Sequence, residues 1–318
     1  MKKIAVIEKI HKDGLDLLQK NPNYTYELIT DVSEENLIKK LPNFDACTLR
    51  ITRLDEKILK HCPNLKVISR HGVGYDNVDL KYIKKNNISL LITATANAVA
   101  VAEHVLSMFL SLSKSIINYD SEVRAGNFKK NANKIQTFEL LNKNILIAGF
   151  GRIGKKLISR CLAFDTKVYI FDPYVDKEVI KKHGGIKIDN IEDGLQNADY
   201  VSLHMPLTPE TKNLINYSVI KKMKKNSIIV NTARGGIINE NDLEKALNEN
   251  LIFGAALDVF SKEPIENNNP LIKNKKVVLS PHSATFTDEC TSRMAIETTK
   301  NIIDFFEKKI NKSMIINL

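Results

Sequence analysis

Three side chains suited to acid–base and anion chemistry follow strand-like runs in the second half of the chain. Arg234 ends SIIVNTAR, Glu263 lies in ALDVFSKEP and His282 lies in VVLSPHSAT. A guanidinium offers a fixed fork that can hold the carboxylate and keto oxygen of a small acid. A histidine can accept the proton of an alcohol whose carbon gives up a hydride, and a carboxylate beside it fixes the tautomer. We therefore expect a catalytic group of Arg234, Glu263 and His282 that needs no metal ion.

Alternatives to these roles remain open from the residues alone. Arg234 is one of only 8 arginines beside 39 lysines, which favours a specific need for a guanidinium over a surface cation paired with a helix carboxylate. His204, in SLHMPLTPET at another strand end, competes with His282 as the base. The position of Glu263, 19 residues before His282, favours His282.

A glycine-rich turn at 149–156, GFGRIGKK, follows the apolar run NILIA and precedes a helical stretch. In this context Gly149 allows a tight turn, Gly151 lets the backbone approach a pyrophosphate, and Gly154 lets helix and strand pack closely. Asp172 ends the next strand, 18 residues past Gly154. It would accept hydrogen bonds from ribose hydroxyls and repel a 2′-phosphate, which favours NAD over NADP. The alternative is a glycine turn without a ligand.

The elements that must position these residues alternate between strands and helices. IAVI at 4–7 is followed by a helical pattern near 11–20 and by YELI at 26–29, and LKVISR and ISLLIT continue the series. A long apolar helix is expected from 99 to 117, then a polar surface segment at 124–143. A second series begins at Asn144 with the runs NILIAGF, KVYIF, YVSLH, SIIVN, FGAALDV and KVVLSP. This alternation predicts an α/β protein with parallel sheets covered by helices.

Composition limits the class of protein. With 318 residues, 43% of them apolar, the chain can form two domains of ordinary size, and no signal peptide or membrane span is expected. Four widely spaced cysteines argue against disulfides and a zinc site, and so favour the cytoplasm. The net charge of +10 comes from scattered lysines, which favours attraction of small anions over nucleic-acid binding.

The motifs NTARGG, LDVFSKEP and SPHSAT, together with GFGRIG and RHGVGYDNVD at 70–79, resemble the D-2-hydroxyacid dehydrogenase family over essentially the whole chain. The resemblance is to its phosphoglycerate dehydrogenase-like branch. It implies reversible NAD-dependent oxidation of a D-2-hydroxyacid to a 2-oxoacid. Arg234 would bind and polarise the substrate, Glu263 would pair with the histidine, and His282 would be the general base or acid.

The resemblance also implies the domain organisation. Two Rossmann-like doubly wound domains are expected, with an NAD-binding domain at 98–286 inserted into a discontinuous, flavodoxin-like substrate domain at 1–97 and 287–318. Hinges would lie near ATANAV and after SPHSAT, and catalysis would occur in the cleft between the domains. The helix after Asn97 resembles the element through which family members form homodimers.

Further binding residues are carried over from the same resemblance. Arg152 and Ile153 would meet the pyrophosphate. Thr232, Ala233 and Asp258 would line the nicotinamide site. His204 and Pro206 would contact the cofactor, which gives the competing histidine a different role. The backbone N–H groups of Gly72, Val73 and Gly74 would bind the substrate carboxylate as an anion nest.

The substrate is the least determined feature. Arg50, in ACTLRITRLD, resembles the position from which phosphoglycerate-using members direct an arginine towards the substrate phosphate, and 3-phosphoglycerate with phosphohydroxypyruvate is the leading candidate. His71 and Tyr75 are bulkier than that branch usually carries, so hydroxypyruvate, glyoxylate or another small acid is the alternative. Arg53 and Arg70 could be surface cations.

Two other functional classes rank lower. A non-catalytic NAD-binding corepressor is disfavoured by the retention of the three catalytic residues. Formate or phosphonate oxidation is disfavoured because it expects glutamine or another neutral partner in place of Glu263. The chain ends 36 residues after His282, so no C-terminal regulatory domain and no feedback by serine are expected.

Overall fold

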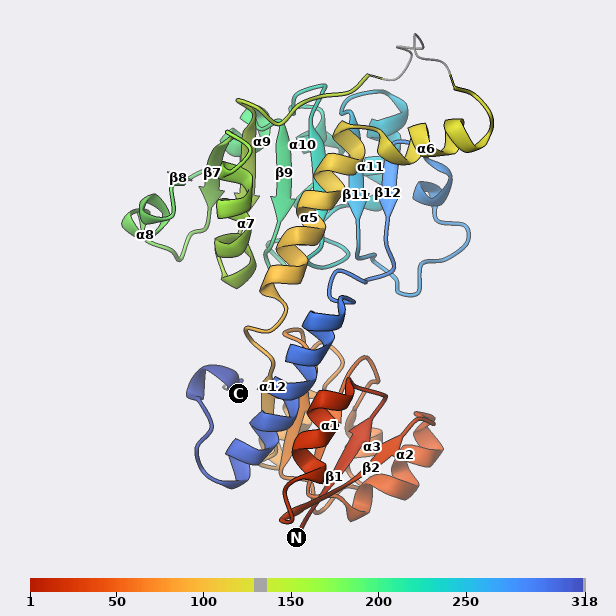
Figure 1. Cartoon of the computed structure of the whole chain (residues 1–318), viewed down its shortest axis with the longest axis vertical. Helices are drawn as coiled ribbons and strands as arrows, with labels where there is room; N and C mark the ends of the chain where they lie inside the picture. Colours follow the sequence, from red (N-terminus) through yellow and green to blue (C-terminus); the bar gives the residue numbers. More distant parts are fainter. Residues whose placement is uncertain (129–135, 317–318) are drawn as a thin grey trace. The chain divides into compact units, whose positions relative to one another are not determined.

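The computed structural model describes residues 1–128 and 136–316 (Figure 1). The chain forms two compact units, which are described separately. Unit 1 comprises Met1–Asn97 and Phe286–Leu318, and unit 2 comprises Ala98–Thr285. The polar segment expected at 124–143 lies partly outside the described residues, since 129–135 are not among them.

Unit 1 is built on a five-stranded sheet whose strands all pair in parallel, in the order β2-β1-β3-β4-β5. This is the flavodoxin-like order of doubly wound folds. Its strands are β1 (Lys2–Ile7), β2 (Tyr24–Ile29), β3 (Ala46–Leu49), β4 (Val67–Arg70) and β5 (Ser89–Ile92). Its helices are α1 (Lys12–Gln19), α2 (Glu34–Lys40), α3 (Glu56–Leu59), α4 (Leu80–Lys85) and α12 (Asp288–Phe306), with 3-10 turns at Leu41–Asn43 and Lys312–Met314.

Alternation along β1 explains how both faces of this sheet are covered. Ile4 and Val6 point into a cluster shared with α1 and α12, whereas Ala5 and Ile7 point into a cluster shared with α2, α3 and α4. Both sets are fully buried. A strand buried on both faces reads as a continuous apolar run, which is why IAVI carries no polar residue.

Unit 2 is built on a seven-stranded parallel sheet in the order β12-β11-β10-β9-β6-β7-β8. Its strands are β6 (Asn144–Ala148), β7 (Lys167–Phe171), β8 (Ile186–Ile188), β9 (Tyr200–Leu203), β10 (Ile228–Asn231), β11 (Gly254–Leu257) and β12 (Val277–Leu279). Its helices are α5 (Ala98–Ser113), α6 (Ile116–Arg124), α7 (Arg152–Leu162), α8 (Lys177–Lys182), α9 (Ile191–Asn197), α10 (Tyr217–Ile220) and α11 (Glu240–Asn248), with a 3-10 turn at Pro270–Lys273.

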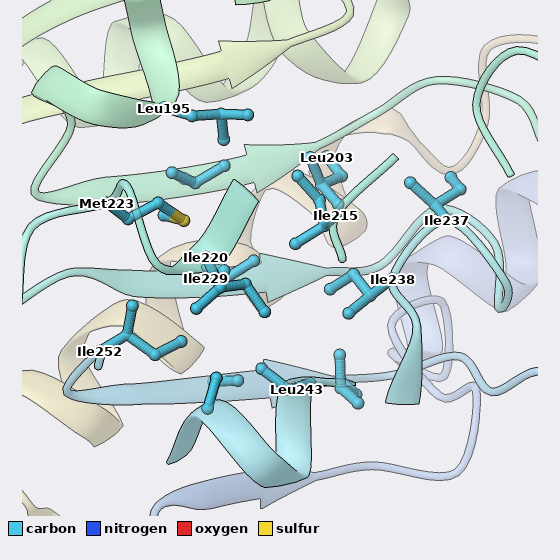
Figure 2. Close-up of a cluster of buried hydrophobic side chains, with 14 of the residues drawn as sticks. Leu195, Leu203, Ile215, Ile220, Met223, Ile229, Ile237, Ile238, Leu243 and Ile252 are labelled. Carbon is cyan, nitrogen blue, oxygen red and sulfur yellow. The ribbon is translucent and has the colours of Figure 1, made fainter. Parts of the chain in front are cut away.

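Two apolar clusters hold the helices of unit 2 on the sheet. One packs α9, α10 and α11 on one face, and Figure 2 shows Leu203, Ile229 and Leu243 in it. The other packs α5 and α7 on the opposite face through residues such as Phe109 and Leu157. The strand order reverses between β6 and β9: β7 and β8 lie on one side of β6, and β9 to β12 lie on the other. Doubly wound sheets bind ligands beside this point, at the carboxyl ends of their strands. The predicted α/β class with two doubly wound parallel sheets is confirmed.

The long helix expected at 99–117 is confirmed as far as Ser113, but it is not continuous to 117. The structure has α5 ending at Ser113 and α6 starting at Ile116, with a bend of 59° between them. Ser115 has a left-handed φ of 49°, and the Ser113 hydroxyl lies 2.8 Å from the Tyr200 hydroxyl. Over the described residues no single helix is long and apolar enough to cross a membrane; only this bent pair has the length and composition.

Candidate active site

The glycine turn after β6 has three different steric requirements. A Cβ on Gly149, whose φ is +104°, would lie 2.6 Å from the carbonyl oxygen of His204. A Cβ on Gly154 would lie 2.4 Å from the carbonyl oxygen of Gly149. In contrast, a Cβ on Gly151 would meet no heavy atom within 4 Å. Gly149 and Gly154 are therefore needed for packing, while Gly151, the N-cap of α7, leaves space where an anion can approach the helix N-terminus.

Asp172 lies at the end of β7, beside this turn. One carboxylate oxygen accepts a hydrogen bond from the amide of Phe150 at 2.7 Å, and the other accepts one from the amide of Tyr174 at 2.9 Å. The side chain therefore holds the glycine turn against the end of β7, a role that the sequence did not reveal. A carboxylate has about four acceptor positions, so it can still receive ribose hydroxyls.

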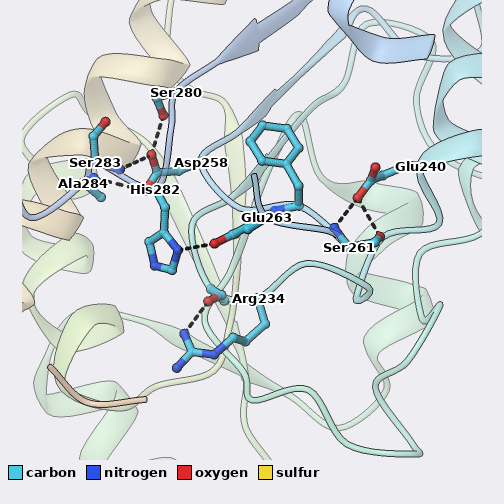
Figure 3. Close-up of polar contacts among 11 residues, drawn as sticks. Arg234, Glu240, Asp258, Ser261, Glu263, Ser280, His282, Ser283 and Ala284 are labelled. Carbon is cyan, nitrogen blue, oxygen red and sulfur yellow. Dashed lines mark hydrogen bonds and ion pairs between the residues drawn. The ribbon is translucent and has the colours of Figure 1, made fainter. Parts of the chain in front are cut away.

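His282 and Glu263 form a close pair in unit 2 (Figure 3). Nδ1 of His282 lies 2.8 Å from Oε2 of Glu263, and Oε1 of Glu263 accepts a hydrogen bond from the amide of Phe260 at 3.0 Å. The His282 side chain is 53% exposed. Because Glu263 engages Nδ1, Nε2 is left as the nitrogen that can exchange a proton with a ligand.

The charge of Glu263 is stabilised by its surroundings. Partial burial raises the pKa of its carboxyl group, but the hydrogen bonds from His282 and Phe260, with the charges of His282 and Arg234, outweigh burial and lower the pKa below its usual value. Glu263 is therefore ionised at neutral pH and can hold His282 in one orientation.

Arg234 lies in the turn after β10, below the pair in Figure 3. Its Nη1 donates a hydrogen bond to the carbonyl oxygen of Ala233 at 2.6 Å. The buried amide side chain of Asn231 shapes the turn, because Nδ2 donates to the carbonyl oxygen of Arg234 at 2.8 Å and Oδ1 accepts from the amide of Ala233 at 3.0 Å. The structure thus brings Arg234, Glu263 and His282 together.

The turn of Arg234 and the loop of Glu263 touch through their backbones. A Cβ on Gly235 would lie 1.9 Å from the carbonyl oxygen of Phe260, so no other residue fits there without displacing one segment. Glu240, on α11, adds a further restraint by accepting hydrogen bonds from the amide and hydroxyl of Ser261, each at 2.6 Å. Neither Gly235 nor Asn231 was identified as a site residue from the sequence, although both lie within the NTARGG motif.

His204 lies in a different environment from His282. Its backbone packs against Gly149, its Nε2 lies 2.8 Å from the hydroxyl of Ser202, and its buried Nδ1 has no partner among the described residues. Burial lowers the pKa of His204 to about 4, so the ring is neutral near pH 7. Of the two competing histidines, His282 therefore pairs with the carboxylate of Glu263, whereas His204 packs against the glycine turn.

Asp258 is fully buried and organises the loop that carries His282. Its Oδ1 accepts hydrogen bonds from the hydroxyl of Ser280 at 2.5 Å and the amide of Ser283 at 2.8 Å, and its Oδ2 accepts one from the amide of Ala284 at 3.0 Å. Asp258 therefore has a structural role in this loop, and its expected role in lining a nicotinamide site stays a prediction. Thr232, by contrast, has a buried hydroxyl without a hydrogen-bond partner in the described part of the chain.

The remaining expected cofactor residues lie near the carboxyl ends of the same strands. Arg152 is exposed and Ile153 half-buried at the start of α7. Ala233 is half-buried in the turn after β10. Pro206 is exposed after β9, and its carbonyl oxygen accepts the hydroxyl of Thr211 at 2.7 Å. No group of three or more side chains among residues 1–128 and 136–316 could hold a metal ion.

In unit 1, basic groups gather at the ends of β3 and β4. The Nη1 of Arg50 donates to the carbonyl oxygen of Lys9 at 2.9 Å, and the Nη1 of Arg70 donates to that of His71 at 2.8 Å. Burial, with the charges of Arg50 and Arg70, lowers the pKa of His71 to about 4. Arg53 is exposed as a surface cation would be, whereas the side-chain contacts of Arg70 are partly buried.

The expected anion nest differs at its first residue. The amide of Gly72 donates to the carbonyl oxygen of Arg70 at 2.9 Å. Contrary to the expectation, it is therefore not available to bind a ligand. Its φ of +148° suits glycine, and a Cβ there would lie 3.1 Å from Nη1 of Arg70. Within the described residues the amides of Val73 and Gly74 have no acceptor, so an anion could be bound by these two.

The strand order of unit 2, the glycine turn, the carboxylate after β7 and the His282–Glu263 pair define an α/β dinucleotide-binding protein with an acid–base site. Residues 106–284 match the family model described as "D-isomer specific 2-hydroxyacid dehydrogenase, NAD binding domain". The chain belongs to the D-isomer specific 2-hydroxyacid dehydrogenase family, whose members act on CH–OH donors.

Two curated relatives align with almost the whole chain. The D-3-phosphoglycerate dehydrogenase of Archaeoglobus fulgidus is 33% identical over 95% of this chain and 57% of its own length. The glyoxylate reductase of Thermofilum pendens is 34% identical over 98% of this chain and 94% of its own. The chain thus spans only about half the length of the phosphoglycerate dehydrogenases that it matches.

Solved structures share the fold over the full length. The NAD-dependent formate dehydrogenase of Staphylococcus aureus in complex with NAD has a TM-score of 0.86 and 27% identity, over 99% of both chains. An acyclic imino acid reductase, Bsp5, in complex with NADPH and D-Arg has a TM-score of 0.88 and 25% identity, over 99% of this chain and 100% of its own. Similar folds therefore bind either nicotinamide dinucleotide.

Proposed function

We propose that this protein is an NAD-dependent oxidoreductase that interconverts a D-2-hydroxyacid and a 2-oxoacid. The observation that carries the proposal is the 2.8 Å pair of His282 and Glu263 beside Arg234, at the carboxyl edge of a sheet with a dinucleotide-binding turn. The same residues argue against a non-catalytic corepressor and against formate oxidation, since Glu263 is a charged partner for the histidine.

The residues of unit 2 fit a dinucleotide. The open space at Gly151 leaves room for phosphates at the N-terminus of α7, and Thr232 offers a buried hydroxyl that no group among residues 1–128 and 136–316 engages. Arg152 and Ile153 would contact the pyrophosphate. The carboxylate of Asp172 would receive ribose hydroxyls and repel a 2′-phosphate, so we propose NAD as the cofactor over NADP.

In the reductive direction, bound NADH supplies the hydride that the carbonyl carbon of the 2-oxoacid receives. Arg234 holds the keto oxygen and polarises it. The protonated His282 donates the Nε2 proton to that oxygen and becomes neutral. The products of the hydride and the proton transfer are a 2-hydroxyacid and NAD⁺. Glu263 retains its charge throughout and stabilises the imidazolium before transfer. In the oxidative direction His282 accepts the alcohol proton instead.

Two substrates are supported by different observations. Phosphohydroxypyruvate with 3-phosphoglycerate is supported by Arg50, whose positive charge lies near that of Arg70 at the strand ends of unit 1, as their joint lowering of the pKa of His71 indicates. Glyoxylate, from the alternative group of glyoxylate, hydroxypyruvate and other small 2-oxoacids, is supported by the match to a glyoxylate reductase over 94% of that protein's length. The amides of Val73 and Gly74 would bind the carboxylate common to both.

Consumption of NADH by the purified chain against phosphohydroxypyruvate, hydroxypyruvate, glyoxylate, sulfopyruvate and phenylpyruvate tests the proposal. We expect turnover with at least one acid, and about 10⁴-fold or greater loss of kcat in a His282→Gln variant that still binds NADH. An Arg50→Ala variant separates the substrates. If Arg50 binds the substrate phosphate, the KM for phosphohydroxypyruvate should rise, whereas the KM values for the unphosphorylated acids should not change. Absence of turnover with every acid, in both directions, would reject the proposal.

A homodimer is part of the proposal, since the resemblance implies association through α5. The neighbouring helix α6 supports it: none of its residues is buried, and Ile116, Ile117 and Val123 are each more than half exposed. The four cysteines are buried and free, which supports the cytoplasm as the compartment.

A further inference from the structure

His104 lies on α5 and has no part in the acid–base pair, yet it contacts the loop that carries His282. Its Nε2 lies 3.0 Å from the hydroxyl oxygen of Ser280 and 3.7 Å from Oδ1 of Asp258. The Ser280 hydroxyl donates its proton to Asp258 at 2.5 Å. Ser280 can therefore only accept from His104, so the Nε2–H group of His104 donates. The result is a directed chain from His104 to Ser280 to Asp258.

This series of hydrogen bonds ends at Asp258, whose side chain fixes the loop that carries His282. Asp258 binds the amides of Ser283 and Ala284 through its carboxylate, and its backbone carbonyl oxygen accepts the amide of His282 at 2.8 Å. Residues 280–284 are thus held to Asp258 on both sides of His282. The loop needs such restraint because His282 has a left-handed φ of 51°, which non-glycine residues adopt only where neighbouring groups hold them.

We propose that His104 is a positioning residue for the reaction. Its hydrogen bond to Ser280 orients the Ser280 hydroxyl towards Asp258, and Asp258 sets the loop so that Nδ1 of His282 meets Glu263. The inference rests on the proposed function, in which His282 moves the proton. No proton travels along this chain; its members orient one another.

The consequence is specific to the chemical step. Loss of the His104 contact leaves Ser280 with one fewer partner and loosens the loop, while the glycine turn and Asp172 lie on other strands. A small displacement of a proton-transferring group raises the barrier by more than it weakens ground-state binding. We therefore expect kcat to fall while the KM values stay nearly constant, a separation that general destabilisation would not produce.

Four variants of the full chain test this: His104→Leu, His104→Gln, Ser280→Ala and the double variant of His104→Leu with Ser280→Ala. The Leu variant should lower kcat about tenfold to hundredfold, with KM for NADH and the 2-oxoacid changed by less than about twofold. The Gln variant keeps an N–H donor and should recover kcat to within about threefold of the wild type. The double variant should be no slower than the slower single variant, because both changes break one chain.

Ser107→Ala is the matched control, because Ser107 is exposed one turn along α5 and its hydroxyl donates to the carbonyl oxygen of His104 and to no other group in the described part of the chain. Its kinetics should equal those of the wild type. A Leu variant with wild-type kcat, a Gln variant as slow as the Leu variant, or additive losses in the double variant would each overturn the proposal.

Hydrogen exchange gives a readout that does not need turnover. In the His104→Leu variant the amides of Ser283 and Ala284 should exchange faster, with peptides from β6 and β7 unchanged. If the wild type reduces no 2-oxoacid, the proposed function fails, and this exchange still decides the positioning role. Unchanged exchange at residues 280–284, or faster exchange throughout unit 2, would overturn it.

Discussion

A single carboxylate sets the properties of the acid–base pair. Glu263 binds the ring of His282 with one oxygen and the amide of Phe260 with the other, and Arg234 adds a positive charge nearby. These contacts favour the ionised form despite partial burial. The orientation of the base and the acid stability of its loop therefore depend on the same side chain.

A Glu263→Gln variant should show this dependence in thermal unfolding. Because the pKa of Glu263 is lowered in the folded state, its ionised form contributes stability that is fully present above the ordinary value of 4.5. That contribution is lost as the pH falls through the lowered pKa. The difference in Tm between the wild type and the variant should be largest near neutrality and shrink in acid.

The control for this measurement is Glu266→Gln, since Glu266 is an exposed carboxylate that pairs with Lys262 on the surface. Its Tm should follow that of the wild type at every pH. A constant Tm difference for Glu263→Gln from neutral to acid pH would contradict the assigned ionisation of Glu263.

At this scale the sequence singles out three strand ends as the proposed catalytic site, and the structure brings their side chains, Arg234, Glu263 and His282, together. Other contacts depend on side-chain direction across long separations. His104 and Ser280 are 176 residues apart, and no sequence motif contains both, so their contact could not be predicted from the sequence. The amide of Gly72 is bonded to Arg70 by a local backbone turn that residue types alone do not specify.

The glycine turn before α7 shows that one motif contains residues under different constraints. Gly151 borders open space, whereas Gly154 touches the backbone of Gly149. Ligand binding and packing can therefore be separated within six residues, 149–154.

Gly151→Ala should weaken NADH binding about tenfold or more while changing the free energy of unfolding by less than about 1 kcal/mol, because the methyl group enters only the open space. Gly154→Ala should instead destabilise the fold by about 1–3 kcal/mol, because its Cβ overlaps a carbonyl oxygen. Titration calorimetry and denaturant unfolding measure the two effects. Equal destabilisation by both substitutions would contradict the assignment.

Strand and helix alternation made most elements predictable, because buried parallel strands are continuous apolar runs. The break between α5 and α6 was not predicted, because the three polar residues 113–115 between Leu112 and Ile116 also fit the exposed face of an unbroken helix. The break coincides with tertiary contacts, in which the Ser113 hydroxyl meets Tyr200 of β9. The three-residue strand β8 lacks a run long enough to recognise.

For the whole molecule, the division into two units predicts where a dinucleotide stabilises the chain. NADH at saturating concentration should slow hydrogen exchange in peptides of unit 2 that contain 149–154, 172 and 232–234. At about 100 times its Kd, binding should add about 2.7 kcal/mol to the free energy of unfolding. Peptides from β1 and β2 of unit 1 serve as internal controls. Protection confined to unit 1 would contradict the assignment of the cofactor site.

The backbone contact between Gly235 and Phe260 has a consequence for exchanging parts between family members. Since the segments carrying Arg234 and Glu263 leave no room for a side chain between them, each has a shape that fits the other. A chimaera that takes 231–236 from one relative should also take 258–263 from that relative. Transplanted together, the two segments form one interchangeable module, whereas either segment transplanted alone would fit poorly against its neighbour at the proposed catalytic centre.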